Sequence, residues 1–551
     1  MRWLSWARTT SKTVALAAAV AVALSTSSRG EEDEPALTPK RGGTLEFAVE
    51  GEPANYDCHA NSSFAFLHPI APYYSNLLKF DAANYPDIKG DLAESWSVSP
   101  DRRVYTFKLR PNVLFHDGSR LTSADVKASY ARIVNPPAGV ISARRPSYAA
   151  ISAIETPDAR TVVFRMSWPE AAMLQNFASP WNCIYSATKL AIDPEFPKKH
   201  ILGTGPFVFV GHVPGSHLTG KRWDRYFDVG KPYLDGYTAR FMSGEAVIAA
   251  IERGEIQAQF RSVSPTQRDH LETSSMGDKL KIMESPLLVN LMLTFNTRHP
   301  PFDDVRVRRA LSLGIDRWQM ADALSNTTYL KFVGGIMRPG FSMATPEAEL
   351  AALPGFSHDS AASRAEARRL LTEAGVLNLS FTLLNRGIPL PYAPAARFAI
   401  EAWREIGVNV TEKPLQNKEW LAALEAGDFD VAFEFQGDYF DDPTQQLAKY
   451  VSRDLSPVNY SSATDRMLDA LFVGQAISGD RRQRSNIVRD FERRVFSEAY
   501  TVPVLWWNRI VVTSARLEDW FLTPSLYLNQ DLADVWLKPA ESKACPGAAP
   551  C

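Results

Sequence analysis

The sequence predicts an α/β protein with more than one domain, and three observations support this fold class. The chain has 551 residues, which is enough for two or three domains and a large buried core. Apolar residues make up 45% and aromatic residues 11%, as is usual for globular proteins. Strand and helix patterns alternate regularly over residues 379–436, which is typical of a parallel sheet with helical crossovers.

A positive flank followed by a short apolar run opens the chain. Three basic residues precede the run Val14–Leu24, and small residues follow at 25–28. This is the pattern of a secretory signal peptide, and the run is shorter than the roughly 20 apolar residues that span a bilayer. We therefore expect residues 1–28 to be a cleaved signal peptide and residues 29–41 a polar linker, with a short membrane anchor as the alternative.

The net charge of −2 gives no support to binding of nucleic acid or of an anionic membrane surface. Disulfides are possible in an exported protein, and the chain has four cysteines. Cys545 and Cys551 lie together in the tail "CPGAAPC", so we expect them to pair, and Cys58 to pair with Cys183. Four free thiols are the alternative, and none of the cysteines has the spacing of a zinc site.

Alternation of apolar and polar residues predicts the strands of the first half of the chain. They are expected at 44–49, 103–109, 161–166, 205–212 and 287–297.

Capping signals and apolar stripes predict the helices. Thr122 and Asp125 fit a capping box for one helix. Ser363 and Glu366 fit another, in a helix that ends at Gly375. These and the other helices of this part are expected over 121–133, 243–254, 303–316 and 363–375.

The second half has a β-α-β-α-β pattern. Strands at 379–385, 408–414 and 430–436 alternate with helices at 393–407 and 417–427. Ligands of parallel sheets bind just beyond the carboxyl ends of the strands. Arg386 follows the first of these strands and Asp438 follows the last, so we expect a base and an acid to face the same crevice.

The stretch "GDYFDDP" begins at Gly437 and places three acids after a strand. Asp438 in a closed, water-poor cleft is suited to bind a cation, because charge-assisted hydrogen bonds are stronger than neutral ones. The alternative is a turn or N-cap aspartate. For Asp441 and Asp442 we expect the capping role, ahead of a helix that starts at Pro443.

Aromatic and polar candidates lie at two further strand ends. Adjacent side chains of a strand face opposite ways, so one of Trp506 and Trp507 is expected to stack on a ligand and the other to lie in the core. The sequence does not distinguish them. Asn55 and Tyr56 follow the first strand and are candidates for polar contacts with a ligand, although core packing is an equal alternative for Tyr56.

Several long motifs carry a resemblance to a known family. They include "GGTLEFAVEGEPANYD", "NTRHPPFDDVRVRRALSLGIDR" and "ARRLLTEAGV". In order and spacing, from Gly42 to about Leu537, the chain resembles the extracellular solute-binding proteins of family 5, the peptide, nickel and opine class. The resemblance implies a two-lobed periplasmic-binding-protein clamshell with mixed sheets, and a hinge of two strands near Glu284–Asn296 and Tyr500–Trp507.

The resemblance also implies the limits of the lobes. Lobe I is expected over 42–285, with an inserted subdomain near 90–200, and lobe II over 286–500. Residues 501–540 are expected to return to lobe I, and 541–551 to form a tail.

The function implied is that of a monomeric periplasmic protein without a cofactor, which captures a small ligand and delivers it to the permease subunits of an ABC-type importer. In peptide-binding members an aspartate in a "GD" pair takes the α-ammonium of the ligand, and Asp438 matches it. Dipeptide-binding members carry an arginine directly before a "PY" pair, where this chain has Leu390. Arg386 is a candidate substitute for that arginine. Because Asp438 matches the ammonium-binding position, a peptide or another amine-bearing solute is the expected ligand.

Two other functions compete with this one. A secreted hydrolase could use paired carboxylates, but its only support is the number of acids after the last strand. A metal or haem carrier could use the same scaffold, but the nine histidines are scattered along the chain.

Overall fold

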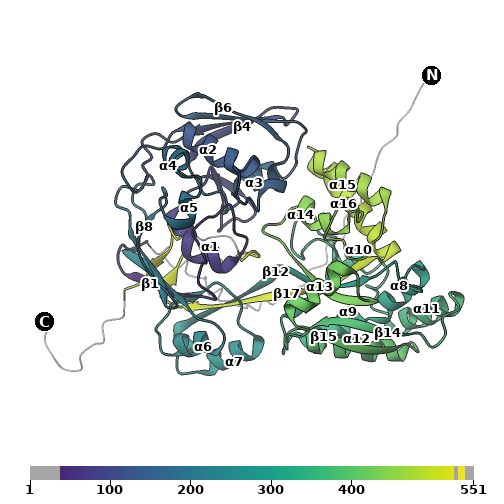
Figure 1. Ribbon diagram of the computed structural model, residues 1–551. Coiled ribbons are helices and arrows are strands. Elements are labelled where there is room, and N and C mark those ends of the chain that lie inside the picture. The colour runs from purple at the N-terminus through teal and green to yellow at the C-terminus, as the bar shows by residue number, and fades with distance from the viewer. Residues whose placement is uncertain (1–37, 527–530, 540–551) are drawn as a thin grey trace, which may run out of the picture. The chain divides into compact units, whose positions relative to one another are not determined.

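The computed structural model describes residues 38–526 and 531–539, and these build five β-sheets (Figure 1). The predicted signal peptide and the predicted Cys545–Cys551 pair lie outside the described residues. The other predicted pair, Cys58 and Cys183, is joined by a disulfide. No helix of the described residues is long and apolar enough to cross a membrane.

Two sheets and a short hairpin are formed mainly by the N-terminal half of the chain. A five-stranded sheet has the order β11-β1-β10-β9-β8, with β1 parallel to both neighbours. A four-stranded antiparallel sheet has the order β4-β5-β7-β6. We call this part of the protein the first lobe. Its strands are β1 (Thr44–Val49), β2 (Leu78–Phe80), β3 (Ile88–Gly90), β4 (Ala93–Val98), β5 (Val104–Leu109), β6 (Ile151–Asp158), β7 (Thr161–Met166), β8 (Phe207–Val213), β9 (His217–Arg222), β10 (Gly236–Phe241) and β11 (Ala258–Gln259).

The predicted β-α-β-α-β pattern is confirmed in a six-stranded sheet. Strand β14 (Ser380–Arg386) is parallel to both β15 (Asn409–Leu415) and β16 (Val431–Gly437). Helices α12 (Tyr392–Glu405) and α13 (Asn417–Ala426) are the crossovers. With β13 (Leu330–Phe332) at one edge, the full order is β13-β17-β12-β16-β14-β15, and we call the part built around this sheet the second lobe.

Two long strands belong to both lobes. Strands β12 (Leu280–Phe295) and β17 (Thr501–Ser514) are antiparallel and lie side by side (Figure 1). The later part of β12 pairs with β16 in the second lobe. Towards the other end, Ile510 and Val512 of β17 pack with Ala48 and Ile248 of the first lobe. These strands contain the two predicted hinge segments except for Asn296 and Tyr500, which lie one residue outside them. The exact limits of the lobes remain a prediction.

The ends of the predicted helices are confirmed in part. Thr122 and Asp125 form the predicted capping box of α2 (Ser123–Val134). The predicted box at Ser363 is wrong, because α11 (Ser360–Glu373) begins earlier and the side chain of Asp359 accepts the hydrogen bond that caps it. The other described helices are α1 (Phe64–Ile70), α3 (Met173–Phe177), α4 (Ala187–Ile192), α5 (Phe196–Lys199), α6 (Glu245–Glu252), α7 (Pro265–Thr273), α8 (Val305–Gly314), α9 (Arg317–Leu324), α10 (Glu347–Leu350), α14 (Pro443–Leu447), α15 (Arg466–Ile477) and α16 (Arg481–Glu498).

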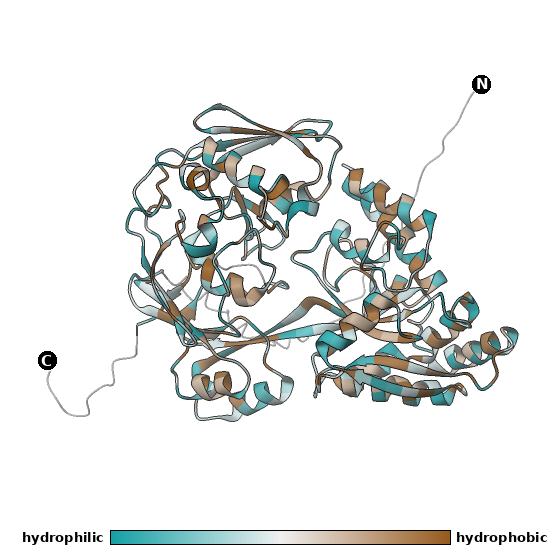
Figure 2. Ribbon diagram, viewed as in Figure 1, coloured by the Kyte–Doolittle hydropathy of each residue, from teal (hydrophilic) through white to brown (hydrophobic). Residues whose placement is uncertain are grey.

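Burial of apolar faces holds each lobe together. Figure 2 shows helices whose ribbons carry both hydrophobic and hydrophilic faces. In α12, for example, Ala395, Ala399 and Trp403 are buried in the core of the second lobe. The largest core of the first lobe includes residues from the far end of the chain, among them Leu517 of β18 (Leu517–Glu518) and Leu537 of β19 (Trp536–Leu537).

Candidate functional site

Strand β16 ends in a position with little space for a side chain. Gly437 pairs with Val289 of β12, and a Cβ at Gly437 would lie 3.3 Å from a methyl group of that valine. The chain then turns at Asp438, whose backbone N–H donates to the carbonyl of Leu288 at 3.2 Å. The carboxyl end of this strand therefore delivers Asp438 next to the long strand β12.

Two of the three acids after β16 are neutralised by buried arginines. Asp441 is paired with Arg338 at 2.8 Å, and Asp442 with Arg484 at 2.7 Å. The predicted cap is confirmed for Asp442, whose side chain accepts from the N–H of Thr444 at 2.8 Å. It is wrong for Asp441, whose carboxylate is occupied by Arg338.

Asp438 is the acid that has no cation. It is half-buried, and its carboxylate accepts a hydrogen bond of 3.1 Å from Gln436, while no ion pair holds it in the described part of the chain. Burial raises the pKa of Asp438 to about 7, and the negative charge of Asp441 adds to this effect. The hydrogen bond from Gln436 and the positive charge of Lys449 act in the opposite direction. Lys449 is itself paired with the buried Glu434 at 2.6 Å.

Arg386 is a cation without an acid. Its Nε donates to Asn417 at 2.7 Å and Nη1 to the hydroxyl of Tyr392 at 3.3 Å, and no carboxylate of the described residues pairs with it. The guanidinium lies over three rings, 5.5 Å from the centroid of Tyr392, 5.4 Å from Trp420 and 5.0 Å from Phe435. Stacking orients this planar group while its remaining N–H donors stay suited to a carboxylate.

The two adjacent tryptophans have different surroundings in the structure. Trp506 is 2% exposed and its Nε1 donates to the carbonyl of Gly335 at 2.9 Å, so it is the core member of the pair. Trp507 is half-buried and stacks on Tyr329 with ring centroids 5.7 Å apart. Its ring also makes a T-shaped contact with Tyr392, so Trp507 and Arg386 both contact the same tyrosine.

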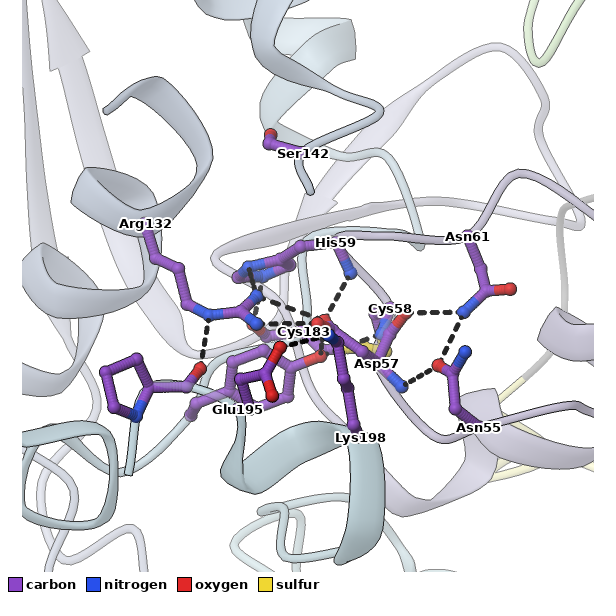
Figure 3. A network of polar contacts seen from close by, with 12 residues as sticks. Asn55, Asp57, Cys58, His59, Asn61, Arg132, Ser142, Cys183, Glu195 and Lys198 are labelled. Carbon is purple, nitrogen blue, oxygen red and sulfur yellow. Dashed lines mark hydrogen bonds and ion pairs between the residues drawn. A yellow bond between two sulfur atoms is a disulfide. The ribbon is translucent and has the colours of Figure 1, made fainter. Parts of the chain in front are cut away.

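Asn55 and Tyr56 belong to contacts within the first lobe. The Tyr56 hydroxyl is hydrogen-bonded to His212 at 2.7 Å. The Asn55 side chain accepts from Asn61 and from the N–H of Asp57 (Figure 3). Neither has a hydrogen bond or ion pair with Asp438 or Arg386 among the contacts of the described residues.

The same network contains a buried ion pair that the sequence reading did not identify. Arg132 binds Asp57 at 2.6 Å, and both side chains are almost fully buried (Figure 3). The hydrogen bond from Arg132 lowers the pKa of Asp57 against the opposing effect of its burial. His59 lies beside the pair, and burial lowers its pKa to about 4, so it is neutral at pH 7. The disulfide at Cys58 ties this network to a second segment of the chain.

A pocket that the sequence reading also missed opens at the carboxyl ends of β1, β10 and β11. It has a volume of about 140 Å³, and its lining includes Glu50, His68 and Arg261. Arg261 is paired with Glu50, so the charges of this pocket are balanced locally. Tyr329 lines the pocket and also stacks on Trp507, which connects it to the aromatic group of the second lobe. In the sequence, this pocket could have been expected only from the rule that ligands bind beyond the carboxyl ends of parallel strands.

Sequence comparison places these features in a family. Residues 87–455 match the sequence model of the bacterial extracellular solute-binding proteins, family 5. Di/tripeptide-binding protein 2 of Pseudomonas aeruginosa is 28% identical over 489 residues, which cover 83% of this chain and 88% of that protein. The glutathione-binding protein GsiB of Pectobacterium atrosepticum is 24% identical over 482 residues, which cover 84% of this chain and 88% of that protein.

Solved structures share the fold over nearly the whole chain. The substrate-binding protein CtaP of Listeria monocytogenes superimposes with a TM-score of 0.78 at 24% identity, covering 90% of this chain and 100% of that chain. AgaA of A. tumefaciens R10, solved in complex with agropinic acid, gives a TM-score of 0.72 at 26% identity and covers 91% of this chain and 99% of that chain. The predicted two-lobed binding-protein fold is confirmed, as is the prediction of a binding protein rather than an enzyme. The family model matches residues 87–455, which are most of the chain, so this chain belongs to family 5 of the bacterial extracellular solute-binding proteins.

Proposed function

We propose that this protein captures a peptide or another amine-bearing solute in the periplasm, with Asp438 as the receptor for the ligand's ammonium group, and delivers the ligand to the permease subunits of an ABC-type importer. The observation that carries the proposal is the contrast among three neighbouring acids. Asp441 and Asp442 each have an arginine, whereas Asp438 is desolvated and has no cation in the described structure. A ligand ammonium would supply the missing charge. The printed names of peptide-binding relatives support this choice of ligand class.

A second charge of opposite sign accompanies Asp438 on the same sheet. Arg386 ends β14, which is parallel to β16, so both residues lie towards the same end of neighbouring strands. We assign Arg386 to an anionic group of the ligand, such as the carboxylate of a peptide, and Trp507 to an apolar or flat part of it. A zwitterionic ligand fits this pair of charges. Leu390 stands where dipeptide-binding members carry their carboxylate-binding arginine, and Arg386 at the end of β14 then takes over the role of that arginine.

The charge of Asp438 can be tested without changing the shape of its side chain. Asp438→Asn is expected to weaken trialanine binding by about ten- to more than a hundredfold, since a charge-assisted bond contributes roughly 1.5–3 kcal/mol. Calorimetry with trialanine and with N-acetyl-trialanine, which lacks the ammonium, measures the effect. Asp428→Asn is the matched control, because that side chain is 75% exposed and its ion pair in the described structure is with Lys413. Equal affinity of the wild type for both peptides would contradict the proposed role, and no binding of trialanine or longer peptides would contradict the ligand class.

The pH dependence of binding follows from the same carboxyl group. The raised pKa of about 7 means that Asp438 of the free protein gains a proton as the pH falls through 7. A protonated carboxyl is a poor partner for an ammonium, so trialanine affinity should fall by about tenfold for each pH unit below 7. It should be highest between pH 7 and pH 8, because the α-ammonium of the peptide itself loses its proton near pH 8. Titration calorimetry between pH 5 and pH 8 is the measurement. Asp438→Asn should remove this slope, and an unchanged slope in that variant would assign it to another group.

Arg386 has its own test with a matched pair of ligands. Arg386→Gln should weaken trialanine binding by roughly tenfold or more, because a hydrogen-bonded charge pair is lost. Binding of trialanine amide, which lacks the carboxylate, should change little. Arg397→Gln serves as the control, since Arg397 is exposed on α12. The same loss for both peptides would show that Arg386 supports the aromatic group rather than the ligand.

We further propose that the protein reaches the periplasm after cleavage of residues 1–28. The basic flank, the apolar run Val14–Leu24 and the small residues after it support cleavage. N-terminal sequencing of the mature protein from its host should find a first residue between about Thr26 and Glu32. A product that retains Met1 would contradict the proposal.

A further inference from the structure

The loop that follows β16 enters the core of the first lobe. Phe440 is 1% exposed and belongs to the apolar cluster around the four-stranded sheet. Its ring centroid lies 5.5 Å from that of Phe80. The N–H of Asp441 donates to the hydroxyl of Tyr85 at 2.7 Å. We call Tyr439–Asp441 the docking loop, because a segment attached to the second lobe buries its phenylalanine in the other lobe.

Tyr439 closes an aromatic stack around a buried arginine of the first lobe. The guanidinium of Arg144 lies 4.5 Å from the ring centroid of Tyr439 and 5.1 Å from that of Trp181. Arg144 is 6% exposed and donates to the Tyr439 hydroxyl at 3.2 Å, and no carboxylate of the described residues pairs with it. Aromatic faces stabilise a desolvated guanidinium, so Tyr439 and Trp181 both favour the buried position of Arg144.

Both residues that contact Tyr439 in this stack are attached to the polar network of Figure 3. Trp181 precedes Cys183 by two residues, and the disulfide of Cys183 belongs to that network. The backbone N–H just before Arg144 donates to the carbonyl of His59 at 2.9 Å. The network thus provides a fixed receiving surface in the first lobe.

The docking loop is equally well fixed to the second lobe. Arg338 holds Asp441 with three hydrogen bonds of 2.8 to 3.1 Å. Arg484 holds Asp442, the next residue. A loop anchored in one lobe and received by the other must be withdrawn if the lobes separate.

We propose that docking of this loop and capture of a cation at Asp438 stabilise each other, so that Phe440 and Tyr85 are positioning residues for the ligand site. Asp438 directly precedes the docking loop. Docking therefore holds a carboxylate in surroundings where it has lost water and gained no cation, which is unfavourable until an ammonium arrives. The coupling rests on the proposed role of Asp438, whereas the docking itself does not.

Docking can be tested on the ligand-free protein by hydrogen exchange of the amides of residues 439–442. Phe440→Ala should speed their exchange by about tenfold or more, because it removes the buried side chain. Tyr85→Phe is a milder variant from the other lobe, and it should speed exchange of the Asp441 amide. Tyr148→Phe is the control, since it loses a buried hydroxyl bonded to Asn176 within the first lobe and should leave the loop unchanged. Unchanged loop exchange in both test variants would overturn the docking.

The coupling predicts an effect of opposite sign at Asp438. At pH 8 and without ligand, Asp438→Asn should slow exchange of the loop amides by about tenfold, because the neutral amide no longer opposes docking. Asp428→Asn should leave exchange unchanged. Faster or equal exchange in Asp438→Asn would overturn the coupling. This measurement uses no ligand, so it is independent of the trialanine assays, which alone decide whether the proposed function fails.

Discussion

The antiparallel pairing of β12 with β17 is the constraint on which the arrangement of the lobes depends. The two strands pair from Leu280 opposite Ser514 to Thr294 opposite Thr501, with register shifts along the way. One end of the pair extends into the six-stranded sheet, and the other packs against the first lobe. The backbone hydrogen bonds between the two strands favour rotation of the lobes about this pair over their free movement.

Three acids of similar sequence context have different electrostatic surroundings. Asp441 and Asp442 lie opposite buried arginines, so their negative charges contribute to the fold without remaining available. Removing either partner would leave an uncompensated buried charge, which is strongly destabilising. Asp438 lies only three residues before the first of these pairs and has a hydrogen bond from Gln436 instead of a cation. The structure thus keeps one acid available by neutralising its neighbours.

Local patterns account for much of the fold and for only part of the site. Alternation and capping predicted the strands and helices over 379–436, and the left-handed Gly427 ends α13 as expected. Contacts between distant segments left no local pattern. Arg338, which pairs with the side chain of Asp441, is 103 residues from it in the sequence. Tyr85, whose hydroxyl accepts from the backbone N–H of Asp441, is 356 residues from it. Strand alternation predicted that one of two tryptophans is buried, but choosing Trp506 required the position of Gly335.

The largest core of the first lobe contains residues from both ends of the described chain, which affects the order in which the chain can fold. Leu45 and Phe47, near the beginning of the first lobe, share a core with Leu517 and Leu537, which are synthesised much later. An incomplete chain therefore exposes part of that apolar surface, and such surfaces favour aggregation. Residues almost 500 positions apart must meet before the first lobe is complete, so its assembly requires the segment that contains Leu517 and Leu537 and not only the first half of the chain.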